Sequence, residues 1–226
     1  MIYLTGDTHI PIDIKKLNMK NFPEQKELSK NDYVIILGDF GLLWQKNKTY
    51  YYWKKWLEER NFTTLWLDGN HENHAWINSL PVSEWNGGKV HRISENIIHL
   101  MRGQVFSIDG NSIFVCGGAT SYDKAQRTVG ISWWPEEDIS FREVDEALTN
   151  LEKVENHVDY VLTHTCPHHM EYDMYESVNP DPTGKFLEEV EKYVGFKKWY
   201  FGHHHIDKEF NDKFTALYQT VIKLGE

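Results

Sequence analysis

The sequence of 226 residues has little cysteine, fewer basic than acidic residues and no long apolar run. Its two cysteines, Cys116 and Cys166, are too few for a disulfide framework, so we expect a cytoplasmic protein. No apolar stretch approaches the roughly 20 residues of a membrane-spanning helix, and we expect no membrane partner. The start of the chain lacks a basic segment followed by an apolar one. We therefore expect a first strand there, not a signal peptide.

Positive charge is also scarce, with 24 Lys and Arg against 34 Asp and Glu and a formal net charge of −10. Sequence-independent binding to nucleic acid depends on neutralising phosphates with basic side chains. General nucleic-acid binding is therefore not expected. A small phosphate-ester substrate stays open, because bound metal ions can supply the positive charge.

The chain shows no internal repeat, low-complexity tract or flexible linker, so we expect one domain over residues 1–226. Apolar runs and turn signals predict strands at 2–5, 33–37, 64–67, 97–101, 104–108, 112–116, 159–163 and 198–201, and a terminal pair at 208–211 and 214–222. Helices are expected at 48–60, 73–79, 136–154 and 184–194. Helices alternate with strands early and hairpins dominate the middle, which favours an α/β fold of layered sheets covered by helices.

Five short motifs place Asp, Asn or His beside Gly or Thr, and four of them directly follow an apolar run. They are Gly6-Asp7-Thr8-His9, Gly38-Asp39, Gly69-Asn70-His71-Glu72, Thr163-His164-Thr165 and Gly202-His203-His204-His205. Sites in open α/β sheets form at the carboxyl ends of the strands. Side chains that are far apart in sequence can therefore converge on one crevice.

The motifs offer only nitrogen and oxygen ligands, which suit Mn, Fe, Zn or Ni better than a metal selected by thiolates. Asp7 and His9 are two residues apart, as are His203 and His205, and residues at that spacing in a strand point the same way. With Asp39, Asn70 and His164, the candidates exceed what one ion needs. A carboxylate shared between two ions would account for them, and two adjacent metals can activate water and clamp a phosphoryl group.

In this order the motifs resemble the calcineurin-like metallophosphoesterase superfamily, whose pattern is D-x-H, G-D, G-N-H-[DE], a lone H and G-H-x-H. The match runs from Asp7 to His205. The resemblance implies a four-layer α/β/β/α sandwich of two mixed β-sheets flanked by helices. It also implies two divalent or trivalent metal ions, with manganese first and iron, zinc or nickel as alternatives.

The resemblance also assigns roles by position. It makes Asp7, His9 and His205 ligands of the first ion, Asp39 the bridging carboxylate, and Asn70, His164 and His203 ligands of the second ion. It makes a metal-bound water or hydroxide the nucleophile. It makes His71 the general acid that faces the scissile phosphate, with Asn70 also holding phosphate oxygens.

The chain departs from the superfamily pattern in two places. Ile10 stands where Gly often follows the first motif, and Leu42 stands where some phosphatases have an Asp that pairs with the catalytic His. The partner that orients His71 is therefore not identifiable from the sequence. Arg127 lies in a segment that is similar to one in some bacterial and phage members, and it could contact a substrate phosphate bidentately.

Taken together, the sequence predicts a two-metal phosphoesterase that acts on a phosphomonoester or a phosphodiester. A nuclease and a non-catalytic metal-binding scaffold are the alternatives, and a protein phosphatase is disfavoured by Leu42. The natural substrate, the native metal and the oligomeric state are not fixed by the sequence.

Overall fold

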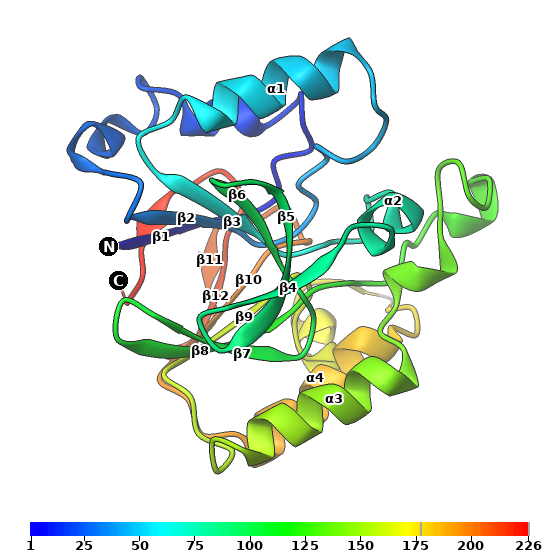
Figure 1. Cartoon of the computed structure of the whole chain (residues 1–226). Helices are drawn as coiled ribbons and strands as arrows, with labels where there is room; N and C mark the ends of the chain where they lie inside the picture. The colour runs from blue at the N-terminus through cyan, green and yellow to red at the C-terminus, as the bar shows by residue number, and fades with distance from the viewer. Residues whose placement is uncertain (177, 226) are drawn as a thin grey trace.

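The computed structural model describes residues 1–176 and 178–225, and its centre is a pair of β-sheets packed face to face. Figure 1 shows helix α1 (Lys48–Glu58) outside one sheet, and α3 (Phe141–Glu152) and α4 (Pro182–Tyr193) outside the other. The predicted four-layer α/β/β/α sandwich is therefore confirmed. No described helix has the length and apolar character needed to cross a membrane.

The first sheet has seven strands in the order β13-β1-β2-β3-β6-β5-β4. Strands β1, β2, β3 and β6 are parallel, whereas β13 and β5 pair antiparallel to their neighbours at either side, and β4 pairs antiparallel to β5. The strands are β1 Ile2–Thr5, β2 Tyr33–Ile36, β3 Thr63–Trp66, β4 Val82–Trp85, β5 Gly88–Ser94, β6 Ile97–Leu100 and β13 Ile222–Lys223.

The second sheet has six strands in the order β11-β12-β10-β9-β8-β7. Its four central strands are parallel, and β7 and β11 pair antiparallel at the two edges. The strands are β7 Gln104–Ile108, β8 Asn111–Cys116, β9 Tyr160–Thr163, β10 Lys198–Phe201, β11 Lys208–Glu209 and β12 Phe214–Ala216.

Alternation along single strands explains how each sheet is covered on both faces. In β2, Ile35 joins the core between the sheets, whereas Val34 and Ile36 pack with Trp53 and Leu57 of α1. The second sheet follows the same rule. Its strand β10 sends Tyr200 inward and sends Trp199 and Phe201 toward the cluster that contains α3 and α4, so three apolar layers separate the four structural layers.

Short helical turns fill the connections, and the only other α-helix described is α2 (His74–Asn78). The 3₁₀ turns are Ile14–Leu17, Pro23–Glu27, Lys124–Gln126, Pro135–Glu137 and His168–Asp173.

The predicted helix at 136–154 begins too early. Pro135 opens a 3₁₀ turn that ends at Glu137, and the α-helix begins only after Ser140. Ser140 accepts from the backbone N–H of Glu143, and the Glu143 carboxylate accepts from the backbone N–H of Ser140. This reciprocal capping box fixes the start of α3 at Phe141, five residues later than the Pro-Glu-Glu signal predicts.

Two strand predictions also need correction. The expected strand at 214–222 is two strands, because the chain leaves the second sheet after Ala216 and pairs with β1 in the first sheet at Ile222–Lys223. The hairpin of β4 and β5 was not predicted. It turns at Asn86-Gly87, a dipeptide typical of tight hairpins, and both residues have positive φ.

The capping box gives a direct test of the start of α3. Replacing Ser140 with Ala should lower the free energy of unfolding by about 1 kcal/mol, because orphan N–H groups of the first turn lose their acceptor. Urea denaturation measures this change. The control is Glu136→Ala, which removes an exposed acid of the earlier predicted start and should change stability by less than about 0.5 kcal/mol. The reverse ranking would contradict the assigned start.

Candidate metal centre

The predicted site residues gather where the parallel strands of both sheets end. Asp7, Asp39 and Asn70 follow β1, β2 and β3 of the first sheet. His164 follows β9 and the His203–His205 motif follows β10 of the second sheet. All seven candidate ligands therefore lie at one edge of the sandwich, which is the position expected for a site in a parallel α/β sheet.

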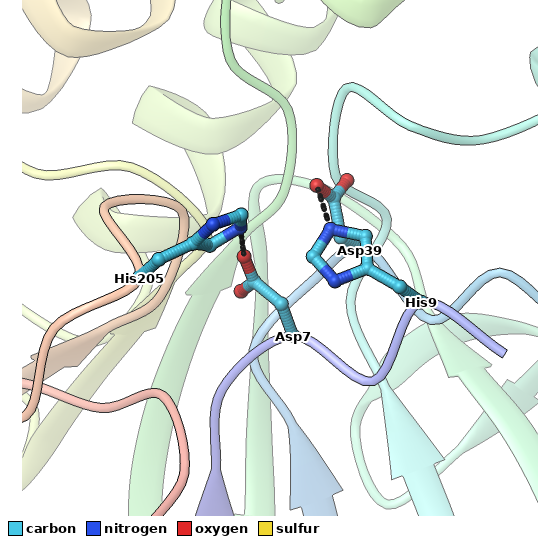
Figure 2. Close-up of side chains that lie close together, drawn as sticks. All are labelled: Asp7, His9, Asp39 and His205. Atoms are coloured by element: carbon cyan, nitrogen blue, oxygen red, sulfur yellow. Dashed lines mark hydrogen bonds and ion pairs between the residues drawn. The ribbon is translucent and has the colours of Figure 1, made fainter. Parts of the chain in front are cut away.

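Four of the candidates form a tight group. One ligand atom from each of Asp7, His9, Asp39 and His205 lies within 4.8 Å of all the others. Figure 2 shows the two contacts inside the group: His205 Nε2 is 3.0 Å from Asp7 Oδ2, and His9 Nε2 is 3.2 Å from Asp39 Oδ2. Both carboxylates are almost fully buried, whereas His205 is half exposed.

Asp13, which the sequence did not indicate, orients the His9 ring. His9 Nδ1 lies 2.9 Å from Asp13 Oδ2, and a carboxylate can only accept, so the proton belongs on Nδ1. In the neutral ring, Nε2 then directs its lone pair at Asp39. Burial alone would lower the pKa of His9, but the bond to Asp39 raises it to about 9 in the absence of a cation. The position therefore favours positive charge.

The second predicted set lies on the other side of Asp39. His164 Nδ1 donates to the carbonyl of Leu37 at 2.8 Å, which leaves Nε2 as the lone-pair nitrogen. That nitrogen is 3.0 Å from Asn70 Oδ1 and 3.5 Å from Asp39 Oδ1. The His203 ring stands edge-on to His164 with 4.9 Å between ring centroids.

In the neutral form that a metal ligand requires, His9 and His164 direct lone pairs at carboxylate or amide oxygens, so a proton or a metal ion must lie between them. The raised pKa of His9 expresses the same demand for positive charge. Asp7 Oδ2 is buried and has no hydrogen bond of acceptable geometry, only the 3.0 Å contact with His205. Ligand distances of about 2.0–2.2 Å leave two neighbouring ligand atoms of one ion about 3 Å apart. The group of Asp7, His9, Asp39 and His205 therefore fits a bound cation.

Backbone conformation presents these side chains at a cost. His9, Asp39, His203 and His205 all have φ between 36° and 65°, in the left-handed region. Such positions typically cost about 1–3 kcal/mol each and persist where the surrounding structure enforces them. Gly38 is constrained more tightly still. With φ at +91°, a Cβ there would lie 2.0 Å from His164 Nδ1, so the second motif requires glycine.

Comparison with known families shows to which family the chain belongs. A model described as calcineurin-like phosphoesterase matches residues 1–207. The chain belongs to the calcineurin-like phosphoesterase family. The Asp and His cluster at the strand ends is a candidate metal-binding group.

Comparisons with individual proteins add less. A similar solved structure is that of a putative 5'-nucleotidase from Staphylococcus aureus in complex with alpha-ketoglutarate, at 14% identity and a TM-score of 0.45. The alignment covers 96% of this chain and 48% of that one, so this chain spans about half its length. Comparison with curated proteins found no match.

The structure places Arg127 against His71. Arg127 Nη1 lies 2.8 Å from His71 Nδ1, Nη2 lies 3.3 Å from Nε2, and Asp123 accepts from Arg127 Nε at 2.7 Å. Burial lowers the pKa of His71, and the Arg127 cation acts in the same direction while Asp39 opposes both. The His71 partner that the sequence left unidentified is therefore a guanidinium and not a carboxylate.

Glu72, the sequence neighbour of His71, serves a different purpose. Its Oε1 accepts from the backbone N–H of Phe40 at 2.6 Å and lies 3.4 Å from that of Gly41. Burial raises the pKa of this carboxyl well above its ordinary value. Glu72 therefore holds the loop that carries Asp39 and does not orient His71.

A cavity of about 450 Å³ opens in front of the cluster. Its lining includes Asn70, His71, His203 and Arg127 from the sequence prediction, and two tyrosines that the prediction missed, Tyr122 and Tyr175. Both tyrosine hydroxyls are occupied, Tyr122 by Glu171 at 3.0 Å and Tyr175 by His204 Nδ1 at 3.1 Å. Their rings therefore present an apolar wall beside a polar centre.

His204 and Lys16 lie near the candidate ligands but outside the ligand cluster. His204 contacts Cys166 Sγ at 3.3 Å through Nε2, so both lie outside the ligand cluster. Lys16, also missed from the sequence, is buried and donates to the carbonyls of Gly6, Asp7 and Tyr218. It holds the strand exit that presents the Asp7 carboxylate.

Gly38 provides a test of this geometry. Gly38→Ala should weaken manganese binding and destabilise the fold, because the new Cβ overlaps the His164 ring in addition to carrying a positive φ. Gly110→Ala is the matched control. Gly110 has φ of +79° with no atom within 4 Å of a new Cβ, so only strain of about 1–2 kcal/mol should appear. Manganese titration and urea unfolding measure the two effects. Equal losses in both variants would show that the His164 contact is unimportant.

Proposed function

We propose that this family member is a two-metal hydrolase of small phosphate esters, formed by one domain over residues 1–226. The single observation that supports the second ion is the position of Asp39. Its Oδ2 lies 3.2 Å from His9 Nε2, and its Oδ1 lies 3.5 Å from His164 Nε2. One buried carboxylate thus presents a separate oxygen to each group of candidate ligands, as a bridging ligand must.

In this proposal the two groups divide the ions between them. Asp7, His9 and His205 would hold the first ion, Asn70, His164 and His203 the second, and Asp39 both. Two such ions, when bound, lower the pKa of a coordinated water toward neutrality and offset the negative charge of a phosphoryl group. Manganese is the proposed metal, because nitrogen and oxygen donors accept it readily.

His71 is proposed to deliver a proton to the leaving oxygen. Arginine can only donate, so the shorter contact, 2.8 Å from Arg127 Nη1, favours Nδ1 of His71 as the acceptor and leaves the ring proton on Nε2, which lies 3.3 Å from Arg127 Nη2. The backbone N–H of His71 donates to Asp39 Oδ1 at 2.7 Å, which ties the position of the ring to the proposed bridging carboxylate. The Nε2–H group is then the donor available to a substrate oxygen.

Arg127 is proposed to bind the phosphate as well as to orient His71. Its guanidinium lines the cavity, and the pairing with Asp123 anchors only the Nε side. Nη1 contacts His71 Nδ1 and also donates to the Ser132 carbonyl at 3.2 Å, whereas Nη2 lies 3.3 Å from His71 Nε2. A planar guanidinium in this position can donate two parallel bonds to a phosphate.

The proposed bridge is tested by removing one charge from Asp39. Chelated protein, reloaded with manganese, is assayed on p-nitrophenyl phosphate and bis-p-nitrophenyl phosphate. We expect metal-dependent turnover of at least one ester, and Asp39→Asn should lose at least about 100-fold of it, since a ligand of both ions is weakened. The preferred ester separates monoesterase from diesterase activity.

Asp212→Asn is the matched control, because it makes the same chemical change at an exposed position. This variant should retain the activity and manganese stoichiometry of the unmodified protein. The proposal fails if Asp39→Asn still binds two ions and turns over normally. It also fails if the unmodified protein, with manganese bound, cleaves neither ester.

Arg127→Ala tests the contact with substrate. We expect KM to rise about tenfold, equivalent to about 1.4 kcal/mol of lost binding, with partial recovery in Arg127→Lys. Lys124→Ala is the control, since Lys124 is exposed and does not line the cavity. An unchanged KM with a lower kcat would instead show that Arg127 acts only through His71.

A further inference from the structure

We propose that Ser121 and Glu137 form a buried positioning pair that fixes the amide of Asn70, so that its oxygen and not its nitrogen faces the second ion. This inference rests on the two-metal function proposed above. None of the five sequence motifs contains either residue.

The Asn70 amide has two ends, and only one can bind a cation. Its Oδ1 lies 3.0 Å from His164 Nε2, beside Asp39, whereas its Nδ2 donates to Ser121 Oγ at 3.0 Å. If the amide turned over, an NH₂ group would occupy the ligand position. Because the nitrogen has no lone pair to offer, the second ion would lose one of its four proposed ligands.

Ser121 enforces this choice because its own proton is already committed. Ser121 Oγ donates to Glu137 Oε2 at 2.6 Å, and a hydroxyl has one proton. Its oxygen must therefore accept from the neighbouring amide, and only the NH₂ end of Asn70 can donate. The two hydrogen bonds are therefore donated in one direction, from Asn70 to Ser121 and from Ser121 to Glu137.

Glu137 holds Ser121 at two points. Besides the bond from the hydroxyl, Glu137 Oε1 accepts from the backbone N–H of Ser121 at 2.8 Å. Asn70 is 4% exposed, Ser121 2% and Glu137 0%, so water has little access to compete with this chain of hydrogen bonds. A buried carboxylate that accepts two bonds from one serine is well suited to hold that serine.

A single guanidinium aligns the two segments that this pair connects. Arg102 donates to the carbonyls of Glu136 at 2.9 Å and Glu137 at 3.1 Å, which anchors the Pro135–Glu137 turn. Arg102 Nε also donates to Asp68 Oδ2 at 2.7 Å, two residues before Asn70. The buried Arg102 side chain therefore fixes the segment of Glu137 relative to the segment of Asn70.

The test is manganese titration by calorimetry, with metal content measured after gel filtration. Unmodified protein should bind two ions. Ser121→Ala should bind the first ion with affinity within about threefold of the unmodified protein, and the second about 10–100-fold more weakly, as for other residues that orient a ligand. Ser121→Thr keeps a hydroxyl and should restore most of the second affinity.

Glu137→Gln gives an independent variant. It replaces one carboxylate oxygen, which accepts a hydrogen bond from Ser121, with an NH₂ group that cannot accept. It should show the same selective loss of the second ion. Ser132→Ala is the matched control, since Ser132 lies in the same segment and its hydroxyl accepts from the backbone N–H of Thr128. It should bind both ions normally. Thermal unfolding establishes that each variant is folded before titration.

The outcomes separate this inference from the proposed function. Normal binding of both ions by Ser121→Ala and Glu137→Gln overturns the positioning pair and leaves the two-metal function intact. Equal weakening of both ions in folded variants also overturns it, because the pair would then only support the fold. If the unmodified protein never binds a second ion, the two-metal proposal itself fails.

Discussion

The Asp39 carboxylate is the constraint around which the site is arranged. It is 1% exposed, follows strand β2, and faces histidines contributed by both sheets. Burying a carboxylate in this way is costly unless opposite charge or donors compensate it. The backbone N–H of His71 supplies one donor, and His9 supplies positive charge, a role that metal ions would take over in the proposed two-metal site.

The fold supplies the rigidity that such a site needs. The core between the sheets is continuous from Leu4 and Ile35 to Leu162 and Tyr200, and the strand ends next to these residues carry the candidate ligands. Small residues then allow close approach. Gly38 lies against the His164 ring, and His164 in turn donates to the Leu37 carbonyl, so one short segment joins the two sheets at the site. Local strain at His9 and Asp39 is stabilised by this surrounding packing.

Much of this arrangement could be predicted from short-range patterns. Apolar runs located most strands that position the ligands, and a polar motif at a strand end predicts convergence because parallel strands end at the same edge. The missed features depend on loop paths instead. Asp13 and Lys16 reach the centre from a 3₁₀ turn, and Glu137 reaches Ser121 because the expected helix gives way to a turn at Pro135. The β4–β5 hairpin carried a local signal in Asn86-Gly87, but its alternation is weak, with Val82 exposed on an edge strand.

The pairing of the chain's two extremities has a consequence for synthesis. Figure 1 shows the described ends of the chain near each other, and β13 pairs with β1. The carbonyl of Tyr218 accepts from Lys16, and His205 lies against Asp7. A ribosome makes Asp7 about two hundred residues before its partner, at about 5–20 residues per second. In the proposed two-metal site, the nascent chain would therefore carry an incomplete ligand set until His205 is made.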